Sequence, residues 1–107
     1  MKVSVVRGGG LAGVVQTTIA DSETLAPEDG ARLRSQVEEA NFFAVPADAD
    51  HASGSPDRFA YTVTVEDGDR THTVRRPETE LPEAVRALID WVSSVPGRDD
   101  RLAPPGP

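Results

Sequence analysis

The feature of this sequence that most constrains its fold is a run of alternating apolar and polar residues that leads directly into a tight-turn dipeptide. Within residues 58–66, large apolar side chains occupy every second position: Phe59, Tyr61, Val63 and Val65. A period of two is typical of a β-strand that buries one face and exposes the other. The dipeptide Asp67-Gly68 favours a hairpin turn, so residues 69–76 are predicted to return as an antiparallel partner strand.

A second predicted hairpin lies near the N-terminus, and its connection is rich in glycine. Two short apolar and β-branched runs, residues 3–6 and 14–20, flank the hexapeptide Gly8–Gly13, whose sequence is GGGLAG. Glycine permits tight turns and close backbone approach, whereas a leucine at the tip of a turn has no core to enter. Leu11 leaves two interpretations open, a hairpin turn without function or a loop that is offered to a partner. A phosphate-binding loop is disfavoured because such a loop opens a helix, and here a strand follows.

Two amphipathic helices complete the predicted elements. The first begins at Pro27, which fits the first turn of a helix and precedes two acidic residues, and it extends to about Asn41. The second opens at residues 81–83 and ends before Pro96-Gly97. Each helix has an apolar stripe at helical spacing, formed by Leu33, Val37 and Ala40 in the first and by Leu81, Val85, Leu88 and Val92 in the second.

These elements predict an α+β fold of order ββαββα, with a four-stranded antiparallel sheet and two helices packed on one face. Residues 1–95 form the single predicted domain, and residues 96–107, which are rich in proline, glycine and charge, are expected to be a disordered tail. The topology places two irregular connections, residues 8–13 and 44–57, at the same rim of the sheet. The second is long for so small a domain, which favours a mobile or functional loop.

Composition argues against several classes of partner. The formal net charge is −7 and neither half of the chain is basic, so nothing indicates binding to nucleic acid or to an anionic membrane surface. The absence of cysteine excludes disulfides and thiolate metal sites. No apolar run is long enough to cross a membrane or to act as a secretion signal, so a cytoplasmic location is expected.

Residue types that carry chemistry in other proteins occur here without partners of the necessary kind. His51 lies among acidic residues that include Asp48, but one histidine in a loop rich in proline and serine is poor support for a metal ion. His72 is expected on a strand surface, and no serine or threonine has the surroundings of an activated nucleophile. We therefore expect neither an enzyme nor a bound cofactor or metal. Arg75 and Arg76 form a local basic spot.

Three segments resemble, in order and spacing, the emfourin family of small proteins encoded beside protealysin-like enzymes. They are RGGGLAG at residues 7–13, NFFAVP at residues 41–46 and PDRFAYTVTV at residues 56–65. The resemblance spans roughly residues 2–92 and leaves out the C-terminal segment. Emfourins inhibit thermolysin-like zinc metalloproteases, so the resemblance implies a proteinaceous protease inhibitor whose partner is a thermolysin-like, protealysin-like enzyme.

The resemblance also implies how the two irregular connections are used. Segments 8–13 and 44–57 are expected to block the active-site cleft of the protease, with Leu11 filling the pocket beside the zinc that favours large apolar side chains. The protease-binding residues that this implies are Gly8, Gly9, Gly10, Leu11, Ala12, Gly13, Asp48 and His51.

The sequence leaves a second class of function open. The alternative is a non-inhibitory protein-binding or regulatory module, which would use the polar face of the sheet around His72, Arg75 and Arg76. A small enzyme is the third and least favoured class, because no nucleophile with a neighbouring base and no cluster of metal ligands is evident.

Overall fold

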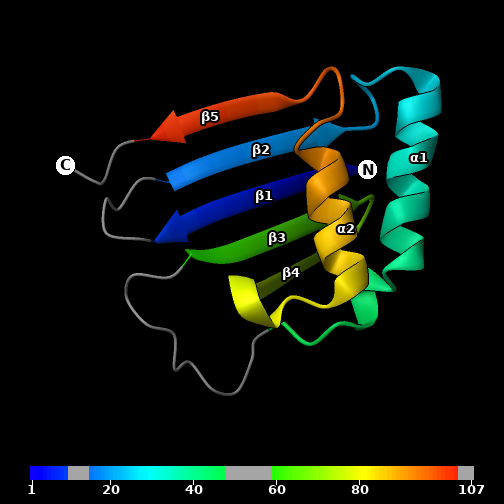
Figure 1. Cartoon of the computed structure of the whole chain (residues 1–107). Helices are drawn as coiled ribbons and strands as arrows, with labels where there is room; N and C mark the ends of the chain where they lie inside the picture. Colours follow the sequence, from blue (N-terminus) through cyan, green and yellow to red (C-terminus); the bar gives the residue numbers. More distant parts are fainter. Residues whose placement is uncertain (10–14, 48–58, 104–107) are drawn as a thin grey trace.

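The structure, a computed structural model, describes residues 1–9, 15–47 and 59–103. An antiparallel sheet of five strands is covered on one face by two helices, as Figure 1 shows. The strands are β1 (Lys2–Gly9), β2 (Val15–Asp21), β3 (Phe59–Asp67), β4 (Arg70–Pro77) and β5 (Asp99–Ala103). The helices are α1 (Pro27–Glu39) and α2 (Glu83–Val92), with the short 3-10 turns η1 (Phe42–Ala44) and η2 (Glu78–Glu80). The spatial order of the strands is β4-β3-β1-β2-β5, so β1 is central.

The strands bury alternate side chains against the helices, as a period of two predicts. β1 pairs with β2 and β3 so that Val3 lies between Ala20 and Val65, and all three are fully buried. The predicted helical stripes are confirmed as buried, except that Leu81 is only partly buried; the buried members are Leu33, Val37, Ala40, Val85, Leu88 and Val92. Burying a valine or leucine side chain contributes about 1.5–3 kcal/mol, so this cluster is the main source of stability.

The sheet contains a fifth strand that the sequence does not predict. β5 lies within the segment 96–107, which was expected to be a disordered tail, and it pairs with β2 at the edge of the sheet. The expectation of four strands in the order ββαββα is therefore wrong. The α+β class, the antiparallel sheet and the two helices on one face are confirmed.

β5 is attached to β2 by main-chain pairing, so its side chains do not need an apolar pattern. The charged side chains from Asp99 to Arg101 are exposed, so no alternation marks the strand. The hydroxyl of Thr18, only 5% exposed, donates to Asp100 Oδ1 at 2.8 Å and joins the two strands through side chains as well. Gly97 adopts a φ of 89°, a left-handed conformation that glycine tolerates, and reverses the chain just before β5.

Removal of β5 tests its role in stability. We expect truncation after Gly97 to lower the free energy of unfolding by about 1–3 kcal/mol, because the buried hydroxyl of Thr18 loses its acceptor and the edge of β2 loses its partner. Urea denaturation followed by circular dichroism measures the change. The control is truncation after Ala103, which should leave stability unchanged to within about 0.5 kcal/mol. Equal stability of the two truncated proteins would show that residues 98–103 do not act as a strand.

Candidate functional site

Both predicted binding segments are attached to the same end of the sheet. β1 ends at Gly9, the last described residue before segment 10–14, and Gly9 pairs with Phe59, the first described residue after segment 48–58. β2 begins on the other side of β1. We call this edge the loop end; its strand residues are Gly9, Val15, Phe59, Pro77 and Ala103 (Figure 1). The described strand ends lie together, as the predicted topology requires.

Of the predicted protease-binding residues, the structure describes Gly8 and Gly9. The others, which are Gly10, Leu11, Ala12, Gly13, Asp48 and His51, lie outside the described residues. A Cβ atom added to Gly8 meets Val15 Cγ2 at 3.7 Å, which is an ordinary van der Waals contact. Gly8 does not have the positive φ that favours glycine. Neither crowding nor backbone conformation in the described part of the chain therefore requires glycine at this position.

Sequence reasoning missed the feature that anchors the start of the second segment, which is a set of hydrogen bonds from β4 to three successive carbonyls. The three bonds are His72 Nε2 to Val45 O at 2.6 Å, Arg76 Nη2 to Pro46 O at 2.6 Å and the Arg75 main-chain N–H to Ala47 O at 2.8 Å. We call them the carbonyl clamp. They fix residues 45–47, which lead into segment 48–58, against β4.

The alternation of β4 decides which of its side chains face the helices. Val74 is buried on that face, so His72 and Arg76, two residues away on either side, point to the same face. Arg76 is 8% exposed, and its Nη1 also donates to the carbonyl of Arg75 at 2.8 Å. β4 is an edge strand and His72 is partly exposed, but His72 and Arg76 do not share a polar face with Arg75, as the alternative binding module expects, because both side chains bind main-chain atoms of their own chain. Arg75 is exposed on the opposite face.

Aromatic residues after α1 hold the ring of His72 in place. Its centroid lies 5.6 Å from that of Phe42, in an edge-to-face arrangement, and 6.1 Å from that of Phe43. The guanidinium of Arg70 lies over the Phe43 ring, 4.1 Å from its centroid, which favours a cation–π interaction. Asn41 turns the chain from α1 into this cluster with a φ of 49°, a left-handed conformation that asparagine tolerates. The chain thus leaves α1 in a direction that packing against β4 fixes.

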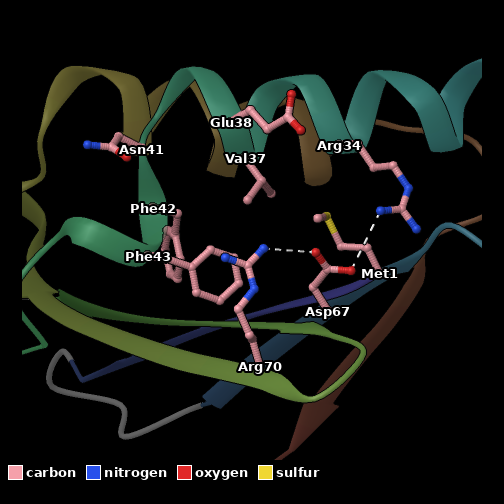
Figure 2. A pocket seen from close by; sticks show the side chains of 9 residues that line it. All are labelled: Met1, Arg34, Val37, Glu38, Asn41, Phe42, Phe43, Asp67 and Arg70. Atoms are coloured by element: carbon pink, nitrogen blue, oxygen red, sulfur yellow. Dashed lines mark hydrogen bonds and ion pairs between the residues drawn. The ribbon is translucent and has the colours of Figure 1, made fainter.

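A pocket of about 220 Å³ lies between α1 and the β3–β4 hairpin, at the opposite end of the sheet from the loop end. Asp67 forms ion pairs with Arg34 at 3.6 Å and with Arg70 at 3.1 Å, and Figure 2 shows the two arginines on either side of it. Asp67 and Glu38 balance the two guanidinium charges that line the pocket. Met1 adds an apolar side chain to this lining, and its N-terminal ammonium donates to Ser22 Oγ at 2.9 Å.

The described ranges contain no site for metal chemistry: no three histidine, aspartate or glutamate residues within them are arranged to hold a metal ion. His51 and its acidic neighbours fall in segment 48–58, so the structure does not bear on them. In the same described ranges, neither helix is long and apolar enough to span a membrane. The arrangement that the described residues do offer is a paired strand edge, the loop end, at which the flanks of the two segments lie side by side.

A comparison with family models bears directly on this arrangement. The model named Emfourin matches residues 5–93. The chain belongs to the Emfourin family. The match includes most of β1 and all of β2, β3 and β4, hence the carbonyl clamp and the loop end except for Ala103, whereas β5 lies beyond it. The resemblance found in the three sequence segments is confirmed, and family membership supports a role as a protease inhibitor. Comparisons with curated proteins and with solved structures gave no match.

The substitution Gly8→Ala tests whether this emfourin needs glycine at that position for folding. Because the added Cβ meets only an ordinary contact and alanine is the better strand residue, we expect the free energy of unfolding to stay the same or to rise by up to about 1 kcal/mol. Urea denaturation gives the value. A loss of more than about 1 kcal/mol would mean that the fold itself requires glycine there.

Proposed function

We propose that this emfourin inhibits a thermolysin-like zinc metalloprotease by placing segments 8–13 and 44–57 in the active-site cleft. The observation that carries the proposal is the pairing of Gly9 with Phe59, which brings the flanks of the two segments together at the loop end. Membership in the Emfourin family supports the inhibitory class of function. A single cleft can then receive both segments from one rigid sheet edge.

Glycine and leucine have complementary roles in this proposal. Gly8 and Gly9 carry no side chains, so backbone at the loop end can approach the walls of a narrow cleft closely. Leu11 is the apolar anchor for the pocket beside the zinc, and burial of a leucine side chain contributes about 1.5–3 kcal/mol. In the proposed complex, Asp48 and His51 of the second segment contact the protease beside the first segment.

A second candidate function follows from the face of the sheet that the helices leave uncovered. Register and alternation place a patch of uncharged, partly exposed side chains at its centre: Ser4, Val6, Thr17, Ile19, Thr62 and Thr64. Exposed arginines flank it, since Arg75 lies opposite Thr62 and Arg101 opposite Thr17. An uncharged centre with a charged rim is the usual anatomy of a protein interface, which favours a non-inhibitory binding module as the alternative.

Titration against a panel of thermolysin-like proteases separates the two candidates. Inhibition at micromolar concentration or below, with competition by an active-site ligand, is expected if the segments enter the cleft. The substitution Val6→Arg places a charge in the uncovered face without touching the loop end, so it should leave inhibition unchanged. The uncovered face would be favoured as the binding surface by either of two results. One is that the unsubstituted protein inhibits no enzyme of the panel; the other is that it inhibits and the Val6→Arg protein does not.

Leu11→Ala tests the anchor. Loss of about 1.5–3 kcal/mol of burial corresponds to inhibition weakened by about 10- to 150-fold. The unfolding midpoint should stay the same, because Leu11 is expected to bury its side chain in the protease rather than in its own core. Inhibition constants for the substituted and unsubstituted proteins give the ratio. Unchanged potency would remove Leu11 from the mechanism.

Gly8→Ala provides the matched backbone test. Because Gly8 is dispensable for packing within the described chain, any weakening of inhibition reports on the protease complex. We expect weaker inhibition with unimpaired folding. Wild-type potency would show that the cleft does not approach the backbone at this position.

A further inference from the structure

We propose that His72 and Arg76 are positioning residues for inhibition: through the carbonyl clamp they hold residues 45–47 so that segment 48–58 starts from a fixed point beside the loop end. This inference rests on the proposed function. Neither side chain needs to touch the protease. Their effect is to hold residues 45–47 in place before the complex forms.

The clamp fixes one flank of segment 48–58, and the sheet fixes the other. On one side, three successive carbonyls of residues 45–47 accept hydrogen bonds from β4. On the other side, Phe59 is paired with Gly9 of the central strand. Ordering a loop on binding weakens affinity, so a segment whose two flanks are already fixed loses less conformational freedom when it enters a cleft.

Arg76 is suited to this role by the shape of its head group. Its planar guanidinium donates in two directions, from Nη2 to Pro46 O and from Nη1 to Arg75 O. Placing a guanidinium in a site that is 8% exposed is costly unless its donors are satisfied, and Val74 on the same face shows that an apolar side chain fits this environment. The two carbonyls therefore account for an arginine here. A lysine has a compact ammonium that does not reproduce the fork.

His72 acts on the neighbouring carbonyl through a ring that cannot turn freely. Its contacts with Phe42 and Phe43 fix the plane of the imidazole, and Nε2 lies 2.6 Å from Val45 O. Since a carbonyl oxygen only accepts, this bond requires the proton on Nε2. The aromatic cluster after α1 is thereby connected to the main chain that leads into segment 48–58.

A purely structural role makes a different prediction from a positioning role. If the clamp only stabilised the fold, its loss would lower the unfolding midpoint, while molecules that remained folded would inhibit normally. If it positions the segment, inhibition weakens even under conditions in which the variant is fully folded. The main-chain N–H of Arg75 gives a local signal, because that group is itself a donor in the clamp.

The experiment compares Arg76→Met and Arg76→Lys with Arg32→Met, which removes an exposed arginine of α1 and serves as the control for lost charge. Inhibition constants are measured well below the unfolding midpoint, and hydrogen exchange is followed at the amides of Arg75 and of Val5 in the central strand. For both Arg76 variants we expect inhibition weakened by about tenfold or more and faster exchange at Arg75 but not at Val5. The Arg32→Met protein should match the unsubstituted protein.

A second pair of variants keeps the test decisive if the Arg76 variants do not fold. His72→Gln retains a side-chain N–H donor and should preserve much of the inhibition, whereas His72→Ala should lose it. Inhibition equal to that of the unsubstituted protein in folded Arg76→Met or His72→Ala overturns the positioning role. If the unsubstituted protein inhibits no enzyme of the panel, the proposed function fails, and the positioning role fails with it; the exchange rate at Arg75 then reports only on a contact within the fold.

Discussion

The pairing of β1 with strands on both of its sides is the interaction on which the rest of this emfourin depends. Its inward-facing valines lie at the centre of the core, and its register determines where β2 and β3 begin and end. Gly9 and Phe59 are the last pair of that ladder. The hydrogen bonds that complete the core therefore also bring the flanks of segments 10–14 and 48–58 together, and core stability and binding geometry have one physical origin.

Local patterns in the sequence were sufficient for the elements whose stability comes from apolar side chains. The alternation before Asp67-Gly68 predicted the β3–β4 hairpin, and stripes such as Leu33 and Val37 predicted the buried faces of the helices. β5 was missed because its exposed charged residues resemble a solvated tail, and only the available edge of β2 makes them a strand. The glycine-rich segment 8–13 predicted that a partner binds at the loop end of the sheet, and most of that segment lies outside the described residues.

The carbonyl clamp was beyond sequence reasoning for a related reason. A histidine and an arginine on a polar strand normally face water, and whether they instead meet carbonyls depends on where a distant segment passes. His72 and Val45 are 27 residues apart, and Arg76 and Pro46 are 30 apart. No periodicity spans such separations. Residues 45–47 also lie beside the outer edge of β4, where the main-chain N–H of Arg75 donates to Ala47 O, and this contact limits edge-to-edge association on that side of the sheet.

The register of β5 has a practical consequence for work on this molecule. Ala103 lies directly opposite Val15, so β5 runs toward the loop end, and any group joined after residue 107 is at most four residues away from that edge. Four residues extend to at most about 14 Å, so such a group stays close to the loop end. A fluorophore, affinity tag or immobilising surface attached there competes for the space that a bound protease needs. The β3–β4 turn, which exposes Gly68 and Asp69 at the far end of the sheet, is the better place for a label.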